Sequence, residues 1–164
     1  MILLRNRSAA VVLSVFALAS PVSGAHVMDT GTVTVNVVDQ RVYIAATLPS
    51  KAFSSANTEE IGAQVSRSFR ISSSGRETSL QGVIVSIDRA GHDDIDAYAV
   101  LIIGVAVFDA RPERLRVAIE PTMIAKTGAL DVIASRNVEG RAREVGRRSL
   151  SNRRTVANFS IAAH

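Results

Sequence analysis

A histidine and a methionine near the start of the chain have the chemistry to bind copper. If a leader is removed after Ala25, His26 becomes the first residue, with a free α-amino group beside its imidazole ring. An amine and a ring nitrogen on one residue can chelate Cu(II), and Met28 can add a thioether ligand for Cu(I). His92 is the internal histidine that would complete such a site. The alternative interpretation is an exposed residue at a frayed N-terminus that binds no metal.

Arginines are concentrated near the end of the sequence and could attract an anionic partner. Between residues 136 and 154 there are seven arginines and only two acidic residues. The alternation of a strand places Arg141, Arg143 and Arg147 on one face, and Arg148 lies beside them. These four arginines are therefore the predicted anion-binding or partner-binding residues. The same charges would also discourage edge-to-edge pairing of strands without any ligand.

A short acidic segment over residues 91–96 combines three aspartates with a histidine. Oxygen ligands crowded into one loop can bind Ca²⁺. The spacing of aspartates, glycine and distal glutamate in an EF-hand loop is missing, however. We therefore interpret the segment as a hydrophilic turn before an apolar strand.

Catalytic motifs are missing from the sequence. It contains no G-x-S-x-G elbow, no H-E-x-x-H pair and no glycine-rich phosphate loop. The absence of cysteine excludes thiol catalysis, iron–sulfur clusters and cysteine-liganded zinc. A hydrolase that uses a pair of carboxylates is an alternative that the sequence does not exclude. The prediction is that the chain is not an enzyme and has no cofactor, with copper as the one alternative.

The first 25 residues have the build of a secretory signal peptide. Arg5 and Arg7 give it a positive start, an apolar run over residues 9–19 follows, and small residues precede the expected cut after Ala25. The mature domain would then span residues 26–164 and work in the periplasm or outside the cell. Without the two leader arginines it carries 17 basic and 15 acidic residues, so general nucleic-acid binding is not implied.

The elements that must position these residues are mostly strands. Polar and apolar residues alternate over 30–37 and over 42–48, which predicts an opening hairpin. Asn57 is placed to cap a short helix, on which Ile61, Val65 and Phe69 would form one apolar face. Further strands are expected over residues 83–87, 98–108, 115–119, 130–134, 142–145 and 155–161.

About eight strands and one short helix predict a mainly β fold, an antiparallel β-sandwich, with a barrel as the alternative. The apolar run over residues 97–108 is 12 residues long. It is too short to cross about 30 Å of hydrocarbon as a helix, so no transmembrane span is expected in the mature chain. Its β-branched residues favour a buried central strand instead.

The opening segments are similar to those of a known group of proteins. The run His26-Val27-Met28-Asp29-Thr30-Gly31 and the segment Leu48-Pro49-Ser50-Lys51-Ala52-Phe53 resemble the start of small bacterial periplasmic proteins. They are also similar to the extracytoplasmic N-terminal domain of HupE/UreJ-type membrane proteins. Some members carry an acidic EF-hand-like loop next, but residues 54–60 lack its aspartates and glycine. The resemblance implies an exported β domain, without calcium binding.

Together these observations predict an exported β-sandwich that works by binding or interaction. Its partner is expected to be a protein or an anionic surface. A periplasmic copper-binding protein that uses His26, Met28 and His92 is the alternative.

Overall fold

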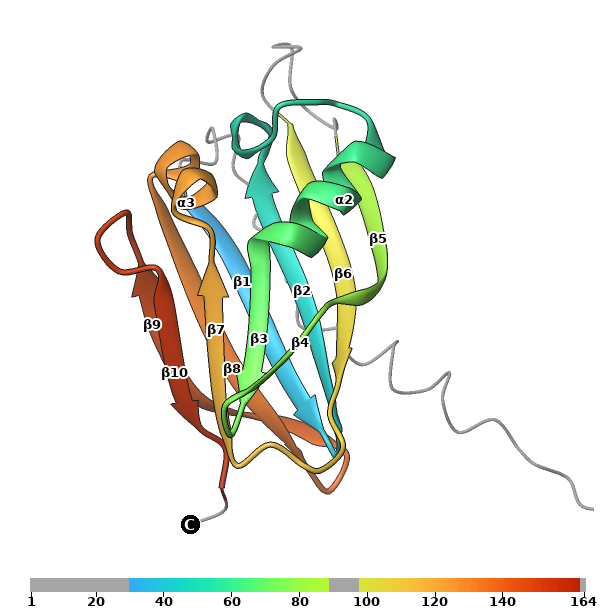
Figure 1. The fold of residues 1–164 in the computed structure, drawn as a ribbon, viewed down its shortest axis with the longest axis vertical. Coiled ribbons are helices and arrows are strands. Elements are labelled where there is room, and N and C mark those ends of the chain that lie inside the picture. Colours follow the sequence, from blue (N-terminus) through green and yellow to red (C-terminus); the bar gives the residue numbers. More distant parts are fainter. Residues whose placement is uncertain (1–29, 89–97, 163–164) are drawn as a thin grey trace, which may run out of the picture.

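The computed structural model describes residues 30–88 and 98–162, which form two facing sheets (Figure 1). The larger sheet has the order β5-β6-β2-β1-β8-β9, and the smaller sheet has the order β10-β7-β3-β4. The strands of the larger sheet are β1 (Thr30–Val38), β2 (Arg41–Pro49), β5 (Gln81–Asp88), β6 (Ala99–Val107), β8 (Ala129–Val138) and β9 (Arg141–Leu150). Those of the smaller sheet are β3 (Phe69–Ser73), β4 (Arg76–Thr78), β7 (Arg114–Ile119) and β10 (Val156–Ser160).

Alternating apolar residues of both sheets fill the space between the two layers. Val33, Val35 and Val37 of β1 are buried, and so are Leu115 and Val117 of β7. Because side chains alternate across a strand, each sheet turns one apolar face toward the other sheet. The predicted mainly β sandwich is confirmed.

Three details differ from the prediction. The described residues form ten strands rather than about eight, and β4 has only three residues. They include a second α-helix, α3 (Pro121–Thr127), which begins on a proline and ends at Gly128 with φ of 80°. Seven residues are too few for a helical period to be recognised in the sequence. The pairing is not antiparallel throughout, since β1 and β8 run parallel.

The helix α2 (Thr58–Ser68) covers the part of the larger sheet that the smaller sheet leaves open (Figure 1). Asn57 Oδ1 accepts hydrogen bonds from the backbone N–H groups of Glu59 and Glu60, at 2.8 and 3.3 Å, as the capping pattern predicts. A methyl group placed on Gly62 would lie 3.7 Å from Val85 Cγ2, so this face of the helix packs against β5. The predicted apolar face is confirmed, although its last residue begins β3 instead of ending the helix.

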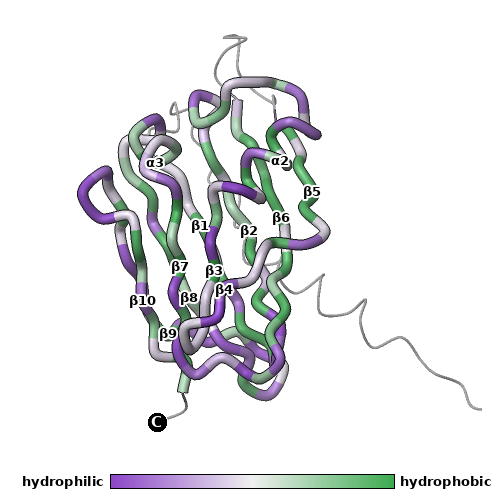
Figure 2. The backbone as a smooth tube through the Cα atoms, viewed as in Figure 1, coloured by the Kyte–Doolittle hydropathy of each residue, from purple (hydrophilic) through white to green (hydrophobic). Residues whose placement is uncertain are grey.

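The strand β6 is interior to its sheet but is buried on one face only. It pairs with β2 on one side and with β5 on the other. Val100 and Ile102 face the core, whereas Leu101 and Val107 are 40% and 41% exposed. Figure 2 shows β6 in green, the colour of hydrophobic residues, along most of its length. The prediction of a buried central strand is therefore wrong for the outer face.

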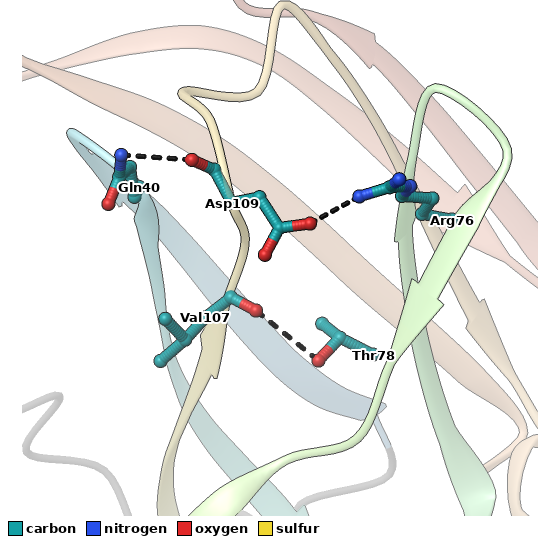
Figure 3. A network of polar contacts seen from close by, with 5 residues as sticks. All are labelled: Gln40, Arg76, Thr78, Val107 and Asp109. Carbon is teal, nitrogen blue, oxygen red and sulfur yellow. Dashed lines mark hydrogen bonds and ion pairs between the residues drawn. The ribbon is translucent and has the colours of Figure 1, made fainter.

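Polar contacts join the two sheets at one end of the sandwich (Figure 3). The side-chain amide of Gln40 donates to the carbonyl oxygen of Asp109 at 3.0 Å, and the Thr78 hydroxyl donates to the carbonyl oxygen of Val107 at 3.4 Å. Arg76 forms an ion pair with the Asp109 carboxylate. Both charged side chains are well exposed, so the ion pair contributes less than about 1 kcal/mol. The network positions the β3–β4 hairpin without forming a reactive site.

No helix among the described residues has the length and apolar character needed to span a membrane.

Candidate functional site

The proposed copper ligands cannot be placed on the fold. His26, Met28 and His92 lie outside the described residues, as does the acidic segment over residues 91–96. Within residues 30–88 and 98–162, no three histidine, aspartate or glutamate residues gather closely enough to hold a metal ion. Copper binding therefore stays a prediction from the sequence.

A β-bulge at Val145 divides the arginines of β9 between the two faces of the larger sheet. The pairing of β9 with β8 skips this residue, which reverses the alternation of side chains beyond it. Arg141 and Arg143 lie on the side that faces the smaller sheet, together with Arg148, whereas Arg147 lies on the outer side. The prediction that Arg141, Arg143 and Arg147 share one face is wrong for this reason.

Two of the four predicted anion-binding arginines already have partners within the fold. Arg147 Nη2 lies 3.7 Å from a carboxylate oxygen of the glutamate three residues before it. The guanidinium carbon of Arg148 lies 6.0 Å from the centre of the Phe159 ring, within range of a cation–π contact. Arg141 and Arg143 are exposed and form no ion pair with any described residue. They remain candidates for an anionic partner.

A second basic cluster lies on the outer face of the smaller sheet, which sequence analysis did not identify as a site. Arg114 and Arg116 of β7 alternate with buried residues and therefore point outward. Arg116 lies opposite Ser72 of β3 and Asn158 of β10, and Arg114 lies opposite Ser160. We call these five residues the basic face.

Two hollows adjoin the basic face. One of about 550 Å³ is lined by all five residues of the basic face and by neighbouring residues of the β3–β4 hairpin, which include Glu77. A second hollow of about 540 Å³ continues on the other side of Arg116 and is lined by Arg67 and Arg70. Both hollows therefore place guanidinium groups beside open space.

Two carboxylates line these hollows, Glu77 the first and Glu120 the second, and both have partners within the fold. Arg70 Nη1 lies 2.8 Å from Glu77 Oε1, and Ser68 Oγ donates to Glu120 Oε2 at 2.9 Å. Neither Arg114 nor Arg116 forms an ion pair within the part of the chain that the structure describes. Arg114 and Arg116 are two residues apart on one strand, so their Cα atoms are roughly 6.6 Å apart. One anion or a short anionic polymer can therefore contact both guanidinium groups.

Part of this basic cluster can be predicted from the sequence. Alternation of Arg114, Leu115 and Arg116 shows that both arginines share one face. Which strands flank β7, and hence which polar side chains surround the arginines, depends on pairing between segments more than 40 residues apart.

No protein-family model and no curated protein matches the chain. The resemblance to HupE/UreJ-type extracytoplasmic domains stays a prediction.

Proposed function

We propose that the chain is an exported, non-catalytic interaction protein that binds an anionic partner through the basic face. The observation that carries the proposal is the pair Arg114 and Arg116, which line one hollow and form no ion pair among the described residues, because the carboxylate in that hollow, Glu77, pairs with Arg70. The predicted leader supports the exported part of the proposal.

The side chains of the basic face suit carboxylate, sulfate or phosphate groups. A guanidinium group donates two parallel hydrogen bonds to such an anion, and the Ser72 and Ser160 hydroxyls and the Asn158 amide can donate further ones. Each contact at an exposed surface is weak, and affinity then comes from several contacts made together. Binding of this kind falls as salt screens the charges.

The described residues favour binding over nucleophilic chemistry at this position. They include no histidine and no cysteine, so within these ranges the hydroxyls of Ser72 and Ser160 have no imidazole beside them that could act as a base. Both hollows are open to solvent.

The proposal predicts that the double variant Arg114→Ser/Arg116→Ser binds an anionic polymer less tightly. With polyglutamate as the probe, we expect roughly tenfold weaker binding at low salt, since each exposed charge contact contributes about 0.7 kcal/mol. Titration calorimetry at several salt concentrations measures both the affinity and its salt dependence.

The matched control is Arg41→Ser/Lys126→Ser, which removes two positive charges elsewhere on the molecule. It should retain the affinity of the unmodified protein. Equal weakening by both double variants, or no polyglutamate binding by the unmodified protein, would refute the basic face as the binding site.

The exported part of the proposal predicts a mature protein that starts at His26. Mass spectrometry of the protein recovered from its producing cell should give the mass of residues 26–164. An intact precursor in the cytosol would rule out export, and any other first residue would rule out the amine–imidazole copper chelate at His26.

A further inference from the structure

The outer face of the larger sheet is apolar over most of its area. Ile84, Leu101 and Val107 are 64%, 40% and 41% exposed, and they are the large hydrophobic side chains with the highest exposure among the described residues. The neighbouring outward positions are mostly aliphatic, aromatic or threonine, and Asn36, Ser86 and Ser135 are the polar exceptions. We call the following set the apolar face: Thr32, Thr34, Tyr43, Ala45, Thr47, Ile84, Leu101, Ile103, Val105, Val107 and Ile133.

Strand register places these residues in continuous rows. One row runs across five strands, from Ile84 through Ile103, Ala45 and Thr34 to Ile133. Residues paired across strands point to the same side of a sheet, so the row forms one unbroken strip. A second row, two residues farther along the strands, runs from Ser86 through Leu101, Thr47 and Thr32 to Asp131.

No described element covers this strip. The smaller sheet and α2 both pack on the opposite side of the larger sheet (Figure 1). Side chains of β6 that face that side are buried, whereas their outward neighbours are exposed or half-buried. The larger sheet thus has two largely apolar faces, of which one is packed.

The outer side of the larger sheet, with the apolar face at its centre, has the dimensions of a protein interface. The five strands β5, β6, β2, β1 and β8, about 4.8 Å apart and about nine residues long at about 3.3 Å each, give the whole outer side roughly 24 by 30 Å, or about 700 Å². The largest apolar patch on a typical monomer covers about 300–600 Å², whereas a stable interface buries about 800 Å² on each partner.

We propose that a second copy of this chain packs on the apolar face to form a homodimer. Charged side chains occur only at its margins and are of both signs, as with Arg41, Asp131 and Arg147. Two copies can therefore pack together without burying an unpaired charge. An acidic partner on the same face would bury its carboxylates without a basic partner. Twisted sheets with such side chains stack at about 10 Å, the arrangement that the inner face already has.

The dimer is independent of the proposed function, because the basic face lies on the other outer surface of the sandwich. Its consequence for binding is direct. Two basic faces would point away from the shared interface in opposite directions, so one dimer could hold two anionic partners or two parts of one.

Sedimentation velocity of the protein expressed from the full-length sequence tests the proposal. We expect a dimer at micromolar concentration. The double variant Ile84→Lys/Leu101→Lys would bury lysines in an apolar interface, so its dimer dissociation constant should be about 100-fold higher. The control Val156→Lys introduces one lysine on the outer face of the smaller sheet and should leave the dimer unchanged. A monomer at every concentration, or a dimer that the double variant does not weaken, overturns the proposal.

A second measurement does not depend on the folding of the lysine variant. The chain has no cysteine, so Leu101→Cys introduces a single thiol. A bis-maleimide long enough to span about 24 Å should join two copies through this position. It should not do so through Asn158→Cys on the basic face. The absence of a joined product from Leu101→Cys would also contradict the dimer.

Discussion

Replacing Val35 with aspartate should abolish the folded state at neutral pH, whereas the same change at the neighbouring Thr34 should leave the chain folded. Val35 has 0% of its surface exposed, and in the larger sheet it lies between Ile44 and Ala134. An unpaired carboxylate in this position costs several kcal/mol, a large share of the about 5–15 kcal/mol that stabilises a typical domain. Circular dichroism and urea titration measure the difference.

The pH dependence of the Val35→Asp variant has a defined sign. Burial raises the pKa of the introduced carboxyl in the folded state above its unfolded value of about 3.9. The folded state then binds the proton more tightly, so the penalty grows as pH rises from the unfolded pKa toward the folded pKa. We expect the variant to gain stability on acidification toward pH 4. A folded Val35→Asp variant beside an unfolded Thr34→Asp variant would mean that the two faces of β1 are reversed.

Replacing Phe69 with alanine should lower the free energy of unfolding by about 3–5 kcal/mol. Phe69 is 1% exposed, follows the last residue of α2 and begins β3, where it lies opposite Ile119 of β7. Its ring thus fills the core where the helix and the smaller sheet meet. For a domain of this size the melting temperature should fall by roughly 10–15 °C.

The matched control is Arg70→Ala, the next residue along β3. Its side chain is 60% exposed and pairs with Glu77 on the surface. Loss of such a pair costs less than about 1 kcal/mol. Calorimetry that gives similar melting temperatures for both variants would contradict the packing of the helix-to-strand junction described above.

Local patterns in the sequence were enough to predict the opening hairpin and the first helix. Val33, Val35 and Val37 alternate with polar residues because β1 has one buried face, and that alternation is readable without neighbours. Asn57 caps α2 through contacts within three residues, which the sequence also contains.

The parts that were not predicted depend on long-range pairing or on very short elements. The bulge at Val145 is defined only by the register of β9 against β8, so the split of the arginines between two faces has no local signal. The outer face of β6 is as apolar as the inner one, and composition cannot show which of them another layer covers. The basic face likewise appears only once β7 is placed between β3 and β10.

Site-specific photocrosslinking in the producing cell tests most directly whether this protein works through two separate surfaces. A photoreactive residue would be placed at Asn158 on the basic face or at Leu101 on the apolar face. We expect Asn158 to trap an acidic partner and Leu101 to trap a second copy of the chain. The absence of products from both positions, or the same partner trapped from both, would contradict an interaction protein built in this way.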